Sequence, residues 1–136
     1  MRVGFLVFTF IFSSVVYSDG YQSYSDEQFP ISPNYLSLGK EPNRDIEIRQ
    51  GVPPFFIFGA DQLSLEWVQA NSEYFKERGA IGYLVEALDE SHISSIRRKT
   101  GYKSIFLLSS DQDIGEQLAI KHYPVFLDFE QGVLIR

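Results

Sequence analysis

The sequence predicts one α/β domain over residues 51–136, a three-layer sandwich in which helices cover both faces of a mixed central sheet. Three observations indicate this class: short apolar runs alternate with amphipathic segments, the first two amphipathic segments end at a glycine, and two apolar runs around a short turn close the chain. Alternating strands and helices favour right-handed crossovers, and a terminal hairpin adds antiparallel strands. The expected element order is β-α-β-α-β-α-β-β.

The first strand and the first helix have the clearest signals. Phe55–Phe58 is a fully apolar run closed by Gly59, which is typical of a buried parallel strand. Asp61 or Ser64 can cap the helix that follows, and Gly79 can end it. Apolar side chains recur along this helix at helical spacing, so we expect them to face the sheet. The expected inward residues are Leu63, Trp67, Ala70 and Tyr74, widened by Val68 and Phe75.

The remaining elements follow in order along the chain. Asp89 or Ser91 can cap the second helix, and Gly101 can end it. Residues 130–132 have the length and the glycine of a hairpin turn. The first and fourth strands are expected to be central neighbours in the sheet. We expect strands at 81–85, 104–108, 125–129 and 133–135, and helices at 89–99 and 111–121.

The N-terminal region is predicted to lie outside this domain. Residues 1–18 combine a short basic start, an apolar run and a small last residue, as in a cleaved secretory signal peptide. The apolar run is shorter than the roughly 20 residues of a membrane-spanning helix, so an uncleaved anchor is the second choice. Residues 19–50 carry spaced tyrosines and three prolines. They are expected to form an extended or flexible arm, either a loosely packed leader or a segment that docks on a partner.

Composition excludes several functions. The chain has no cysteine, so it cannot exchange thiols and disulfides. Its formal net charge of −6 disfavours binding to a phosphate backbone. The one basic cluster, Arg97–Lys99 with Lys103, is expected to be a solvated helix end, where cations are favourable. We therefore expect no direct contact with nucleic acid.

No residue pattern indicates catalysis. The two histidines, His92 and His122, are far apart and have no carboxylate at a spacing typical of a zinc site. Asp61, Asp111 and Asp113 stand where helices begin, and capping explains them more simply than acid–base chemistry does. The glycines form neither a phosphate loop nor a dinucleotide motif. The sequence thus predicts no enzyme activity, no cofactor and no metal site.

The Tyr123-Pro124 step is the strongest functional signal. It lies between a predicted helix and a predicted strand, where such a proline can be cis. Thioredoxin-like chains enter the strand beside their active site in this way, and there the backbone before the proline pairs with an extended peptide. The alternative is that Pro124 only turns the chain into the strand. The expected protein-binding groove comprises Asp61, Gln62, His122, Tyr123 and Pro124.

A family resemblance covers residues 53–128. The features that carry it are Gly59, Asp61, Ser64 and Trp67, then residues 79–82, Leu118 and residues 122–125. In order and spacing they resemble an uncharacterised family encoded in integrating conjugative elements of Gram-negative bacteria. Gln62 and Arg78 depart from its pattern, since proline and leucine often stand at these positions in the family.

The resemblance implies a place in a mating-pair-formation, type IV secretion apparatus of the periplasm, and by weaker analogy a thioredoxin-like fold. No enzyme activity comes with it. Two functions stay open: a non-enzymatic assembly or scaffolding component that binds other proteins of the apparatus, and a chaperone-like holdase for pilus or envelope proteins. Neither function needs stable membrane insertion after signal cleavage.

Overall fold

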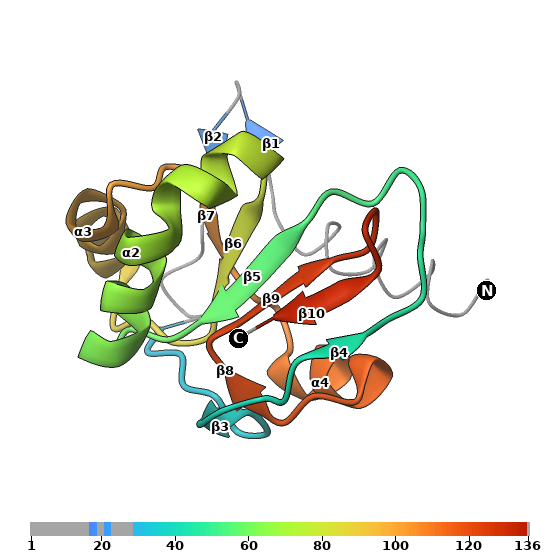
Figure 1. Ribbon diagram of the computed structural model, residues 1–136. Coiled ribbons are helices and arrows are strands. Elements are labelled where there is room, and N and C mark those ends of the chain that lie inside the picture. The colour runs from blue at the N-terminus through green and yellow to red at the C-terminus, as the bar shows by residue number, and fades with distance from the viewer. Residues whose placement is uncertain (1–16, 19–20, 23–28, 136) are drawn as a thin grey trace.

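The structure is a computed structural model that describes residues 17–18, 21–22 and 29–135. Its centre is a six-stranded sheet in the order β4-β10-β9-β5-β6-β7 (Figure 1). The strands are β4 (Arg44–Asp45), β5 (Phe55–Phe58), β6 (Ile81–Leu84), β7 (Ile105–Leu107), β9 (Val125–Asp128) and β10 (Val133–Ile135). The described residues also hold three helices, α2 (Gln62–Arg78), α3 (Glu90–Thr100) and α4 (Asp111–Leu118).

The sheet is mixed, as predicted. β5 pairs in parallel with β6, and β6 with β7, because α2 and α3 return the chain to the same end of the sheet between these strands. β9 runs antiparallel to β5 and to β10, so the predicted central pair and the terminal hairpin are both confirmed. Within this sheet β4, which pairs with β10, was not predicted. The two-residue strand β8 (His122–Tyr123), which precedes β9, was not predicted either.

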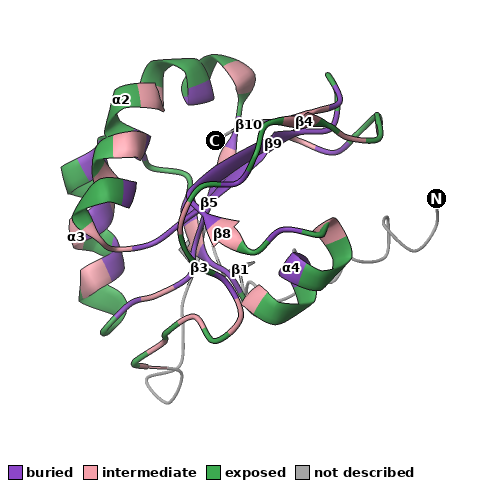
Figure 2. Cartoon of the chain, turned by 60° about the horizontal axis from the view of Figure 1, so that its bottom comes forward, coloured by how far each residue is buried: buried purple, intermediate pink, exposed green. Residues whose placement is uncertain are grey.

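Helices cover both faces of the sheet, which confirms the three-layer sandwich (Figures 1 and 2). α2 and α3 lie on one face and α4 lies on the other, with β5 and β9 buried between them. Successive side chains of a strand point to opposite faces. Phe56 and Phe58 therefore join the core beneath α2 and α3, whereas Phe55 and Ile57 join the core on the α4 side.

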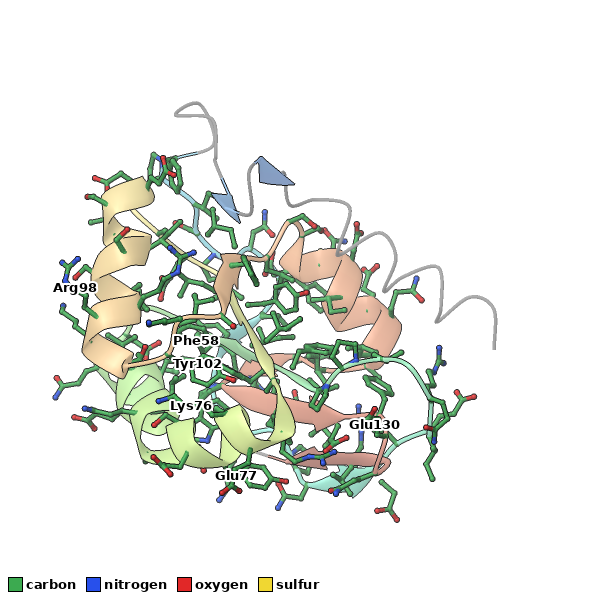
Figure 3. The ribbon with its side chains drawn as sticks, turned by 90° about the horizontal axis from the view of Figure 1, so that it is seen from above. Phe58, Lys76, Glu77, Arg98, Tyr102 and Glu130 are labelled. Carbon is green, nitrogen blue, oxygen red and sulfur yellow. The ribbon has the colours of Figure 1, made fainter. Side chains whose placement is uncertain are left out.

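Aromatic rings fill the layer between the sheet and the helices α2 and α3. Phe75 stacks on Phe56 at a centroid distance of 4.3 Å and on Phe126 at 5.1 Å. Tyr102 meets Phe56 edge-on, and its hydroxyl donates to the carbonyl of Ala80 at 2.6 Å. Burial raises the pKa of Tyr102 to about 12. Figure 3 shows this ring inside the molecule, whereas charged side chains such as that of Arg98 lie on the exposed outer side of the helices.

Helix α2 begins and ends where the sequence predicts. Asp61 is the N-cap, and its Oδ2 accepts the backbone N–H of Ser64 at 2.9 Å. Gly79 ends the helix with a φ of 67°, a left-handed conformation that favours glycine.

The inward face of α2 corrects the predicted stripe. Its buried side chains are Ser64, Val68 and Phe75, and Trp67 is half-buried, with its ring 5.3 Å from that of Phe75. Ser64 turns inward because its hydroxyl accepts the backbone N–H of Gly59 at 3.1 Å. The buried positions of α2 therefore lie one residue further along the chain than the pattern of hydrophobic residues predicted. The residues wrongly predicted to be inward are Leu63, Ala70 and Tyr74.

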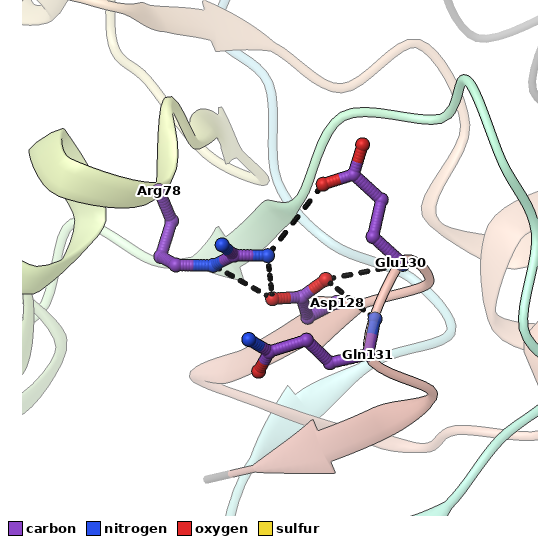
Figure 4. A network of polar contacts seen from close by, with 4 residues as sticks. All are labelled: Arg78, Asp128, Glu130 and Gln131. Carbon is purple, nitrogen blue, oxygen red and sulfur yellow. Dashed lines mark hydrogen bonds and ion pairs between the residues drawn. The ribbon is translucent and has the colours of Figure 1, made fainter.

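A partly buried ion pair joins the end of α2 to the β9–β10 hairpin (Figure 4). Arg78 donates from Nε and Nη2 to Oδ2 of the fully buried Asp128 at 2.9 and 2.7 Å. The other oxygen of Asp128 accepts the backbone N–H groups of Glu130 and Gln131. Hydrogen bonding to Asp128 raises the pKa of Arg78. One carboxylate thus closes the turn and anchors the helix.

Helix α3 was predicted closely. Asp89 is its N-cap and accepts the backbone N–H of His92 at 2.8 Å, and Gly101 ends it with a φ of 71°. Hydrogen bonds from the hydroxyl of Ser91 and from that N–H lower the pKa of Asp89.

Helix α4 is shorter than the predicted helix over residues 111–121. It is capped by Ser110 and ends at Leu118, because Ala119 takes a left-handed conformation with a φ of 57°. Arg44 then donates to the carbonyls of Leu118 and Ala119 at 2.7 and 3.2 Å. The cap comes from the N-terminal arm, so its source lies far away in the sequence.

From residue 29 the arm is extended and packs closely on the domain. β3 (Ser37–Leu38) pairs in parallel with β8, and farther back β1 (Tyr17–Ser18) pairs antiparallel with β2 (Tyr21–Gln22). The predicted signal peptide lies outside the described residues, apart from β1. Along the described part of the chain, no helix combines the length and the apolar character needed to cross a membrane.

Candidate functional site

The predicted site lies where β5 leads into α2, beside the Tyr123-Pro124 step. Asp61 caps α2, and Gln62 lies on the exposed first turn, where its side chain donates to Glu66 at 2.9 Å. The Tyr123-Pro124 bond is cis, as expected, and both residues are buried. The structure thus brings Asp61 near Tyr123 but turns the side chain of Gln62 along its own helix.

Gly59 makes this convergence possible. A Cβ at this position would lie 2.6 Å from the ring of Tyr123, 2.7 Å from Oδ1 of Asp61 and 2.8 Å from Oε2 of Glu86. Only glycine leaves room for these three groups. Glu86 also accepts the backbone N–H of Ala60 at 2.8 Å, which fixes the entry to α2.

Tyr123 is held in an apolar and acidic environment. Its side chain is only 6% exposed. Burial, followed by the nearby negative charges of Glu86, Asp61 and Asp111, raises the pKa of Tyr123 to about 12. Tyr123 therefore stays a neutral phenol at physiological pH.

The backbone edge before Pro124 is already occupied, which corrects the expectation of an open groove. Ser37 and Leu38 pair with His122 and Tyr123 in the β3–β8 ladder. The N–H of Ser37 donates to the carbonyl of Lys121 at 2.9 Å, and that of Gly39 to the carbonyl of Tyr123 at 3.1 Å. The chain's own arm uses the donors and acceptors that we expected to face a partner, because it lies along the same edge.

Two carboxylates hold the arm at this edge. Oδ2 of Asp111 accepts three successive backbone N–H groups, those of residues 34–36, at 2.7–3.0 Å. In the opposite direction, Glu41 of the arm accepts the N–H groups of Lys121 and His122 at 2.6 and 2.9 Å. The side chain of Glu41 is only 5% exposed. Both carboxylates bind backbone N–H groups through charge-assisted hydrogen bonds.

His122 contacts the arm through its side chain. Its Nδ1 lies 3.2 Å from the hydroxyl of Ser37. Gly39 approaches the same ring so closely that a Cβ there would lie 2.6 Å from Nδ1. The predicted site residue is therefore engaged within the chain, by a serine and a glycine of the arm.

A hollow of about 400 Å³ adjoins the site on the side of α2 and α3. Leu88 on its rim is 69% exposed, and the N–H of Leu88 donates to Nδ1 of His92 at 3.0 Å. The arm contributes one wall, because Ile31 exchanges two backbone hydrogen bonds with Ala87. Its lining includes Ile31, Ala60, Asp61, Glu86, Leu88 and His92.

Several site residues escaped prediction from the sequence. Asp111 was expected to cap α4, but Ser110 takes that place and leaves the aspartate to bind the arm. Glu41, Gly39 and Glu86 gave no periodic or motif signal. Among the described side chains, no group of three or more potential metal ligands converges.

Fold and site together define a class of protein, an α/β sandwich that holds an extended segment at a strand edge through backbone hydrogen bonds. The chain belongs to the family described as "Protein of unknown function (DUF2859)", which matches residues 14–131. Because this range includes the arm as well as the sandwich, the arm is part of the family pattern. No curated protein and no solved structure matches the chain.

Proposed function

We propose that the protein is a non-enzymatic component of a conjugative, type IV secretion DNA-transfer apparatus that acts in assembly or scaffolding through protein–protein contacts. Its place is the periplasm, reached through the signal peptide of residues 1–18. The setting rests on the sequence resemblance over residues 53–128. Its partners are other proteins of the apparatus.

The observation that carries the proposal is the arm paired at β8. The place where a thioredoxin-like protein would hold an extended peptide here holds residues 37–39, through backbone hydrogen bonds. The chain has no cysteine for redox chemistry at this place. Binding extended protein segments is a task that such an edge performs without any chemical step.

The same observation favours a second candidate, a chaperone-like holdase for pilus or envelope proteins. Backbone pairing tolerates many sequences, which suits a holdase. The selective contacts of Gly39 and Glu41 favour a dedicated partner instead, because they set conditions on the bound sequence.

Deletion of the gene from a transferable element tests the proposal. We expect DNA transfer to fall while a panel of envelope proteins keeps its normal folding and abundance, and a wild-type copy restores transfer. Unchanged transfer contradicts the assembly role, and general envelope misfolding favours the holdase.

Mass spectrometry of the periplasmic fraction tests the location. A chain starting at or within a few residues of Asp19 is expected. A full-length chain in the cytoplasm contradicts export.

A further inference from the structure

We infer that the β8 edge is a selective acceptor for an extended segment of another protein with the pattern Leu-Ser-x-Gly-x-Glu, and that residues 36–41 of this chain are its intramolecular occupant. The inference deepens the proposed function and rests on it for the existence of a partner. The pattern follows from what each position of the bound segment contacts.

Two positions are selective for shape. Leu36 is buried in the core on the α4 side, so the first position takes an apolar side chain. Gly39 faces the ring of His122 with no room for a Cβ, so the fourth position takes glycine. Leu38 and Lys40, on either side of Gly39, are exposed, and these positions accept any residue.

Two positions are selective for hydrogen bonding. The hydroxyl of Ser37 lies 3.2 Å from Nδ1 of His122. Glu41 places a nearly buried carboxylate against the N–H groups of Lys121 and His122, and without it two backbone donors lose their partner. Asp111 strengthens binding without selecting a sequence, because it accepts the backbone N–H groups of residues 34–36.

The expected occupant is a different protein and not a second copy of this chain. A tethered segment acts at an effective concentration on the order of millimolar, so an identical segment from another copy cannot displace it at ordinary concentrations. A partner displaces the arm when it adds contacts that the arm lacks. The hollow of about 400 Å³ beside the arm, with the exposed Leu88 on its rim, provides the surface for such contacts.

The test uses the full chain with Gly39→Val and Glu41→Gln, which weakens the chain's own occupant. The probe is a fluorescent peptide of residues 33–45, with binding followed by anisotropy. The control peptide carries Gly39→Val. We expect the variant chain to bind the native peptide at least about tenfold more tightly than the control peptide, because the valine collides with His122. The unsubstituted chain should bind the native peptide far more weakly, since its arm competes.

Release of the arm is measured in the same samples. Trypsin should cut the variant after Lys40 and Arg44 much faster than it cuts the unsubstituted chain. The near-ultraviolet circular dichroism of Trp67 should stay unchanged, because the sandwich stays folded. If the double variant does not fold, Glu41→Gln alone is used, since it keeps the size of the side chain.

Three results would overturn the inference. The first is an arm that stays protected from trypsin, because Gly39 and Glu41 would then not hold it. The second is equal affinity for the native and control peptides. The third is a dimer of the unsubstituted chain formed by exchange of arms, which would make a second copy the occupant. Loss of DNA transfer on gene deletion would still support the proposed function in each of these cases.

Discussion

The two faces of the central sheet are held together by different interactions. Beneath α2 and α3, rings stack and meet edge-on around Phe56 and Phe75. On the other face, the short helix α4 and the arm cover a core of aliphatic and aromatic side chains, and carboxylates fasten the arm by binding backbone N–H groups. The first face depends on burial of large surfaces, whereas the arm of the second combines the burial of Leu36 with directional polar contacts.

Because of this difference, we expect one face to set the global stability of the domain and the other to allow the arm to be exchanged. Rings packed in a core exclude water together, so loss of one weakens the whole layer. Hydrogen bonds between carboxylates and backbone can be replaced by water or by the backbone of another segment at small net cost. The aromatic face is therefore expected to govern global stability, and the arm to detach while the sandwich stays folded.

The largest effect is expected from Phe75→Ala. Its side chain is 2% exposed and contacts the rings of Phe56 and Phe126, so its removal should lower the free energy of unfolding by about 3–5 kcal/mol. Urea denaturation measures this change. The neighbouring Tyr74→Ala is the control, because Tyr74 is 39% exposed, and its loss should be much smaller. Equal losses for the two variants would contradict the dominance of the aromatic layer.

The next effect tests a polar contact on the aromatic face. Asp128→Ala removes the partner of Arg78 and the acceptor for the turn, and should cost about 2–3 kcal/mol. Glu130→Ala is the control, because its ion pair with Arg78 is longer, at 3.5 Å, and exposed. A loss above that of Phe75→Ala would show that the ion pair, and not ring packing, governs this face.

A smaller and more local effect is expected from Asp111→Ala. Three backbone N–H groups of the arm lose their acceptor, for about 1–2 kcal/mol of stability. Hydrogen exchange should rise at residues 34–39 and stay unchanged in β5 and β9. Asp113→Ala is the control, since Asp113 is an exposed residue of the same helix turn. Uniformly faster exchange would mean that the arm and the sandwich unfold as one unit.

The smallest effect compares one tyrosine from each face. Burial alone raises the pKa of Tyr102 to about 12, whereas burial and nearby carboxylates raise that of Tyr123 to about 12. Added salt screens the carboxylates, so it should lower the pKa of Tyr123 slightly and leave the pKa of Tyr102 unchanged. Absorbance titration of the tyrosinate, assigned with Tyr102→Phe and Tyr123→Phe, measures both. If salt changed the two pKa values equally, the carboxylates near Tyr123 would not be a cause of its raised pKa.

The same tyrosines set the direction of the alkaline stability change. Below about pH 10 both are protonated in the folded and the unfolded chain. Between about pH 10 and 12 the unfolded chain loses these protons first, so stability falls as pH rises through this window.

The sequence alone predicted those features whose causes lie within a few residues. Asp61 and Asp89 cap helices because a short side chain binds the N–H of a residue three positions on, and Gly79 and Gly101 end helices because they adopt a positive φ. The hairpin after β9 and the buried run of β5 are equally local signals. The mixed sheet with helices on both faces follows from their order.

Only the tertiary structure decided which surfaces meet. On α2, Ser64 and not Leu63 faces the sheet, because the hydroxyl of Ser64 accepts the backbone N–H of Gly59. The carboxylates of Asp111 and Glu41 accept backbone N–H groups that lie 75–81 positions away in sequence. Nearly all residues carry such an N–H group, so no pattern of side chains predicts the pairing. The Tyr123-Pro124 step was therefore readable as a strand edge, but its occupation by the chain's own arm was not, because it depends on distant segments meeting in space.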